Sequence, residues 1–135
     1  MGHLLRFALQ YRYPGRESGI TVPVRVSLAG HSVDLVAKVD TGAACCVFQR
    51  EVGEQLGLVI EAGLRQQLAT VMGSFWVFGH TVRLETLGVA GEAMVYFAEP
   101  ERFPRNVLGQ RGWLDHVRLA LIDYKSLLYL GRYEP

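Results

Sequence analysis

The sequence is poor in cysteine, in net charge and in long apolar runs. Its two cysteines, Cys45 and Cys46, are neighbours, and adjacent cysteines rarely form a disulfide because the bond strains the backbone. The net charge of +1 gives no electrostatic reason to expect nucleic acid or an anionic membrane as the main partner. No apolar run is long enough to span a bilayer, and residues 1–10 lack the pattern of a secretory signal peptide. We therefore expect reduced thiols and a cytoplasmic location.

Clusters of metal ligands are also lacking. Two adjacent thiols without further Cys or His ligands nearby make a poor zinc site, and the four histidines are scattered without ligand spacing. No serine stands in a nucleophile elbow, which argues against a serine hydrolase. We therefore expect neither a metal nor a cofactor.

The hydrophobic pattern predicts an all-β fold. The chain of 135 residues has room for one domain with a real core, and we expect that domain to cover residues 1–135. Apolar residues recur mostly with period two, and 15 glycines supply many turns. The expected strands cover residues 5–13, 21–28, 32–39, 64–70, 75–87, 90–98, 117–123 and 127–133. Helical spacing is found over residues 49–56 and 109–116.

One short motif carries recognisable chemistry. Asp40, Thr41 and Gly42 form an Asp-Thr-Gly triplet at the end of an apolar run. Two carboxylates within hydrogen-bonding distance cannot both ionise, so one serves as a base while the other serves as an acid. None of the other three aspartates belongs to a second triplet of this kind. The partner carboxylate must then come from another copy of the chain, which predicts a homodimer with its site on the two-fold axis.

Two separated segments resemble the retropepsin-like aspartic proteases, the single-domain dimeric relatives of the pepsins. Residues 37–48 place Asp-Thr-Gly-Ala after an apolar stretch, and residues 106–114 contain an apolar-apolar-Gly segment. The resemblance covers roughly residues 18–130. It implies a single acid-protease lobe with a closed, barrel-like sheet, a flap hairpin and one or two short helices.

The resemblance also implies a reaction and a set of site residues. A water between two Asp40 carboxylates attacks a peptide carbonyl. Thr41 matches the threonine that hydrogen-bonds across the dimer beneath the aspartates, and Gly42 lets the chain turn sharply beside them. The substrate is a peptide or protein, and the residues expected to contact it are Lys38, Ala43, Met72, Gly73, Ser74, Trp76 and Val107.

Several positions depart from the family pattern. Lys38 replaces an apolar residue, and alternation along the strand places it on the same face as Asp40. It would therefore stabilise ionised Asp40, pair with an acidic group of a substrate, or lie solvated at an edge. Ala44 and Gln110 replace a charged pair of the viral members, and Gly73 is the single glycine of the expected flap tip.

These observations leave three functions open. The leading interpretation is an aspartic endopeptidase acting on extended apolar segments. The alternative is a dimer of the same fold that binds peptides or assembles a complex with weak or absent hydrolysis, because Lys38 and the glycine-poor flap could compromise the dyad or its closure. The third is a structural β dimer in which the triplet is coincidental.

The residue after the triplet predicts the pH of maximal activity. Ala43 stands where the pepsin-type enzymes carry serine or threonine, and the missing hydroxyl removes a hydrogen bond to the ionised dyad. The resemblance therefore predicts an optimum at weakly acidic or neutral pH, which a pH–rate profile measures. A maximum well below about pH 4 would contradict this prediction.

Overall fold

Strands make up most of the chain in the computed structural model, which describes residues 1–15, 17–71 and 73–134. The strands are β1 (Leu9–Arg12), β2 (Thr21–Leu28), β3 (His31–Val39), β4 (Cys46–Phe48), β5 (Leu64–Thr70), β6 (Gly73–Thr86), β7 (Val89–Ala98), β8 (Val107–Leu108), β9 (Val117–Ile122) and β10 (Leu127–Arg132). The helices are α1 (Arg50–Gln55) and the 3₁₀ turns η1 (Ile60–Ala62), η2 (Leu114–His116) and η3 (Asp123–Lys125). In the part of the chain so described, no helix combines the length and apolar character that a bilayer crossing needs.

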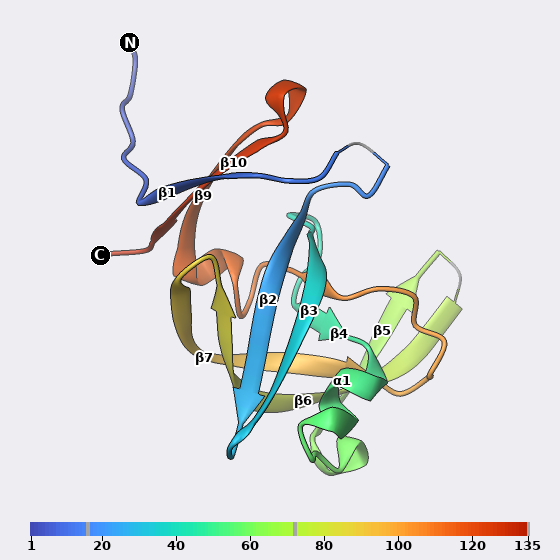
Figure 1. Cartoon of the computed structure of the whole chain (residues 1–135). Coiled ribbons are helices and arrows are strands. Elements are labelled where there is room, and N and C mark those ends of the chain that lie inside the picture. Colours follow the sequence, from blue (N-terminus) through green and yellow to red (C-terminus); the bar gives the residue numbers. More distant parts are fainter. Residues whose placement is uncertain (16, 72, 135) are drawn as a thin grey trace.

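Six strands close into a barrel in the order β2-β3-β8-β4-β7-β6, because β6 pairs again with β2 (Figure 1). The short strand β8 runs parallel to β3 and antiparallel to β4. Strand β5 pairs with the first half of β6 and extends the sheet as an outer hairpin. This closed all-β lobe with little helix confirms the expected fold class.

A smaller antiparallel sheet, in the order β1-β10-β9, lies beside the barrel. Figure 1 shows both chain ends on the side of this sheet. Its strands come from the two ends of the described chain, so it joins the first strand to the last two.

The core fills the inside of the barrel. Val22, Val24 and Val26 of β2 are at most 2% exposed, because alternate side chains of a strand share a face. Phe48 and Phe97 meet edge to face in the same core, with their ring centroids 6.3 Å apart. A second buried cluster packs against the β5–β6 hairpin and consists of Cys45, Val47, Val77 and Ala98.

The helix predicted over residues 109–116 is wrong for most of that range. Only Leu114–His116 form a single 3₁₀ turn. Gly112 has a φ of 104°, which lies outside the helical region, and Gly109 passes close to another chain segment. The first predicted strand is also shorter than expected and covers only Leu9–Arg12. The other predicted strands and the helix of residues 49–56 are present with small shifts of their ends.

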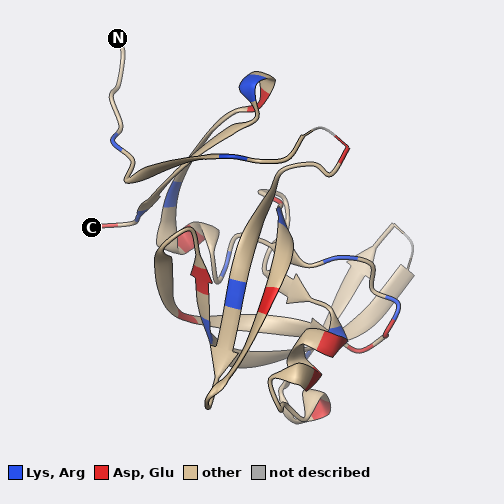
Figure 2. Ribbon diagram, in the orientation of Figure 1, with Lys and Arg blue, Asp and Glu red and all other residues tan. Residues whose placement is uncertain are grey.

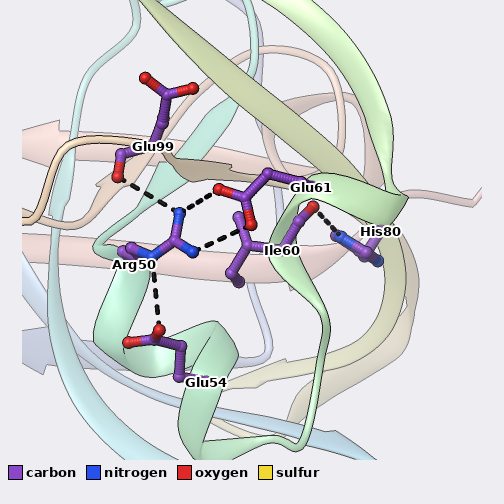
Figure 3. A network of polar contacts seen from close by, with 6 residues as sticks. All are labelled: Arg50, Glu54, Ile60, Glu61, His80 and Glu99. Carbon is purple, nitrogen blue, oxygen red and sulfur yellow. Dashed lines mark hydrogen bonds and ion pairs between the residues drawn. The ribbon is translucent and has the colours of Figure 1, made fainter.

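One arginine ties α1 to its neighbours (Figure 3). Arg50 donates hydrogen bonds to the Glu61 carboxylate at 2.6 and 2.9 Å, to Glu54 at 3.3 Å and to the backbone carbonyl of Glu99 at 3.3 Å. The ring of His80 on β6 lies 2.9 Å from the first backbone carbonyl of η1. These contacts hold α1, η1 and the end of β7 together at the point where the β5–β6 hairpin begins.

The Arg50–Glu61 contact predicts a pH-dependent contribution to stability. Hydrogen bonds from Arg50 lower the pKa of Glu61, because they favour the ionised carboxylate. The contribution is therefore complete above the ordinary glutamate pKa of about 4.3 and is lost as the pH falls through the lowered value. We expect Glu61→Gln to lower Tm at about pH 7 and to approach the wild-type Tm toward about pH 3, as thermal unfolding measures.

Glu134→Gln is the control, because Glu134 is exposed near the C-terminus and forms no ion pair with the described residues. Its Tm should follow the wild type at both pH values. A deficit for Glu61→Gln of equal size in neutral and acidic solution would show that the ion pair is not its cause.

Candidate active site

Asp40 follows β3 directly and begins a tight turn. The Gly42 N–H donates a hydrogen bond to Asp40 Oδ1 at 2.9 Å, and the Ala43 N–H donates to the Asp40 carbonyl at 3.2 Å. The N–H of Asp40 itself donates to the carbonyl of Leu108 at 3.0 Å. The residue is nevertheless exposed. The turn therefore orients one carboxylate and leaves it accessible.

The segment after β8 runs against this turn. The N–H of Gln110 donates to the Ala43 carbonyl at 2.8 Å, and the N–H of Arg111 donates to the Ala44 carbonyl at 3.0 Å. The Gln110 side chain adds a hydrogen bond from Nε2 to the Thr41 carbonyl at 2.7 Å. These backbone and side-chain hydrogen bonds hold the turn in place, so its shape depends on Gln110 and Arg111, which are distant in the sequence.

Gly109 marks the closest approach of the two segments. A Cβ added there would lie 2.2 Å from the Cys45 carbonyl oxygen and 2.7 Å from that of Ala43. Cys46 Sγ accepts a hydrogen bond from the Gly109 N–H at 3.5 Å. Burial raises the pKa of Cys46 to about 12 and also raises that of Cys45. Both thiols therefore stay protonated and packed, which argues against a redox role.

The β5–β6 hairpin contains the residues that were expected to form a flap. Gly73 and Ser74 are exposed at its turn, while Met72 lies outside the described residues, so its role stays a prediction. Trp76 is 36% exposed, and the Arg65 guanidinium lies 4.4 Å from the centroid of its ring. Its neighbour Val77 is fully buried. Trp76 is therefore partly exposed beside Arg65, and its contact with a substrate stays a prediction.

The structure brings some of the expected site residues together and leaves others apart. Asp40 to Ala43 share one turn, and Lys38 pairs in register with Val107, which is 8% exposed. Gly73, Ser74 and Trp76 lie on β6, and within the described ranges no hydrogen bond or ion pair joins them to the Asp40 turn.

Sequence reasoning missed two side chains that position this region. Gln110 has no signal that links it to Thr41. Gln49 shares reciprocal hydrogen bonds with Asn106, from its N–H to Oδ1 at 2.8 Å and from Asn106 Nδ2 to its own Oε1 at 3.4 Å. Gln49 Nε2 also donates to the Phe103 carbonyl at 3.1 Å. Asn106 thus anchors the loop before β8, and Gln49 is its partner.

A family profile described as aspartyl protease matches residues 22–121, which include the Asp40 turn and the segment after β8. The chain belongs to the aspartyl protease family. The resemblance expected from the two sequence segments is thereby confirmed. No curated protein gives a match to the chain. Family membership supports a protease-type hydrolase as the general class of function, and the roles of the individual site residues stay predictions.

The crossing at Gly109 makes a direct prediction for stability. We expect Gly109→Ala to destabilise the protein by about 3 kcal/mol, because its Cβ would overlap two backbone carbonyls that cannot move aside cheaply. Gly91→Ala is the matched control, since a Cβ at Gly91 in β7 meets nothing within 4 Å. Chemical denaturation measures both variants. Equal losses in the two would mean that the close crossing is not what requires glycine.

Proposed function

We propose that the protein is an aspartic endopeptidase that acts as a homodimer, with a water held between the Asp40 carboxylates of two copies. The observation that carries this proposal is the Asp40 turn, which presents one exposed carboxylate in a fixed orientation. Membership of the aspartyl protease family supports the reaction class. We take residues 1–135 as one domain that acts in the cytoplasm on peptides or proteins, without a metal or cofactor.

The other aspartates support a second copy as the source of the partner carboxylate. Asp34 forms an ion pair with Arg25 at 2.7 Å. Asp115 accepts a hydrogen bond from the Gly112 N–H at 3.1 Å, and Asp123 accepts one from the Tyr13 hydroxyl. Each has a local structural role, which leaves Asp40 as the aspartate suited to a dyad.

In the proposed reaction, the ionised Asp40 of one copy takes a proton from the water while the water oxygen attacks the peptide carbonyl carbon. The protonated Asp40 of the other copy donates its proton to the carbonyl oxygen. Collapse of the tetrahedral intermediate breaks the C–N bond, and the proton gained from water passes to the departing amine. One hydroxyl of the intermediate returns its proton to the other Asp40, which gives the carboxylic acid product and restores the dyad. The β5–β6 hairpin and the second copy would together cover the site and exclude bulk water during these steps.

Peptide binding with little hydrolysis is the alternative, and Lys38 is the observation that favours it. This half-buried cation lies on β3, two residues before Asp40. Positive charge nearby favours ionised carboxylates, whereas the dyad needs one of its two carboxyl groups protonated. In that case the wild type would bind peptides that it cannot cleave.

Replacing Asp40 separates these functions. We expect Asp40→Asn to reduce cleavage of an unfolded reporter protein by at least about 1,000-fold, because an amide cannot act as the base, and a statine-type transition-state mimic should inhibit the wild type. Asp34→Asn is the control, since Asp34 is an exposed aspartate of β3, the strand that leads into the Asp40 turn, and it should retain activity. Cleavage that survives in Asp40→Asn would exclude the proposed dyad.

Mixing subunits tests whether the site is shared. Wild-type protein with an excess of Asp40→Asn subunits should lose activity as subunits exchange, because each mixed dimer holds a single catalytic carboxylate. Activity that stays constant despite demonstrated exchange would mean that each chain has a complete site of its own.

A further inference from the structure

An open pocket of about 300 Å³ lies beside the outer face of β3, and two of its lining residues, Lys38 and Arg105, are basic. Figure 2 shows Lys or Arg positions at the end of β3 and along the connection between β7 and β8. The pocket has no acidic residue in its described lining. Its remaining walls are uncharged: Ser18, Thr21, Val36, Gln49, Pro104 and Asn106.

Lys38 is held at this pocket by its neighbours. Its backbone pairs with Thr21 on one side and with Val107 on the other. Its aliphatic stem crosses Gly19, where an added Cβ would lie 2.7 Å from Lys38 Cε and 3.2 Å from Nζ. Gly19 has a φ of 74° and leaves room for the stem. Lys38 therefore lines the pocket with its ammonium group beside Gly19 and with only part of the side chain exposed.

Arg105 reaches the same pocket from a fixed loop. Asn106 follows it directly, and the hydrogen bonds with Gln49 anchor this end of the loop. Phe103, two residues earlier, packs against Phe75 of the β5–β6 hairpin with the ring centroids 5.3 Å apart. The pocket is therefore bounded by the loop that contacts the expected flap.

Among the described residues, neither basic group has an acidic partner. The ion pairs of the described residues are Arg25–Asp34, Arg50–Glu54, Arg50–Glu61 and His116–Asp115, and they include neither Lys38 nor Arg105. Lys38 in particular forms no ion pair with Asp40. An anion in the pocket would therefore meet two positive charges that no carboxylate of the described residues neutralises.

We propose that this pocket binds an acidic side chain, Asp or Glu, of the substrate residue next to the cleaved bond. The inference rests on the proposed protease function. Lys38 and Asp40 are separated by two residues of a strand, about 7 Å, which is also the reach of one substrate side chain from an extended backbone. Ser18, Thr21 and Asn106 supply neutral polar groups that can also bond a carboxylate. The protein thus selects peptides by charge beside the bond that it cleaves.

Two peptides that differ only by Glu or Gln beside the cleaved bond test this specificity. At about pH 6, where glutamate with its ordinary pKa of about 4.3 is ionised, we expect kcat/KM to favour the Glu peptide by roughly five- to tenfold. The preference should shrink in high salt and as the pH approaches about 4. Lys38→Met keeps the aliphatic stem without the charge and should reduce the preference, as should Arg105→Ala, and the double variant should abolish it.

Matched controls come from the same residue types. Lys125→Met changes the only other lysine, in η3, and Arg102→Ala changes an exposed arginine of the same loop that does not line the pocket. Both should keep the wild-type preference for Glu. If Lys38→Met shifts only the pH–rate profile and leaves the Glu-to-Gln ratio unchanged, Lys38 acts on the dyad and the acidic subsite is excluded.

Binding to the Asp40→Asn variant separates the subsite from catalysis. Calorimetry with the same two peptides should show the same preference for Glu, and it should disappear with Lys38→Met added. Preferential binding of Glu without any cleavage by the wild type would support the subsite and contradict the protease. Cleavage that requires Asp40 but treats Glu and Gln equally would overturn the subsite alone. Equal binding together with absent cleavage would overturn both.

Discussion

The close crossing between the Asp40 turn and the segment after β8 is the constraint on which the rest of the site depends. Gly109 passes so near the carbonyls of Ala43 and Cys45 that a side chain has no room. Hydrogen bonds from Gln110 to the carbonyls of Ala43 and Thr41 hold the two segments together. Because β8 pairs with β3 on one side and β4 on the other, the crossing also completes the barrel. The orientation of Asp40 is therefore a property of the whole sheet.

Two electrostatic features matter at the Asp40 turn: the protonation of the proposed dyad and the positive charge of the adjoining pocket. A dyad requires one protonated and one ionised carboxyl group, which low dielectric and close contact would favour once a partner covers the exposed Asp40. Lys38 and Arg105 line the adjoining pocket, and in the proposed complex their positive charge would attract an acidic substrate group. A bound substrate carboxylate would offset this charge. Under this proposal, substrate choice depends on the charge of Lys38.

The sequence predicted features that depend on local pattern and missed those that depend on distant contacts. The strands predicted over residues 21–28 and 64–70 have the same bounds as β2 and β5, because the alternation of apolar and polar residues that marks a strand lies in consecutive residues. The helix predicted over residues 109–116 is wrong because Gly112 adopts a positive φ, which the spacing of apolar residues does not reveal. The hydrogen bond from the Gln110 side chain to the Thr41 carbonyl joins residues 69 positions apart, so no local sequence pattern predicts it.

The distance between the two Asp40 carboxylates in an experimental structure of the assembled protein tests the central claim most directly. A shared dyad predicts a homodimer in which the nearest carboxylate oxygens of the two copies lie about 3 Å apart, with one water between both groups. A monomer at concentrations where the protein cleaves peptides, or a dimer whose Asp40 carboxylates lie more than about 6 Å apart, would contradict it.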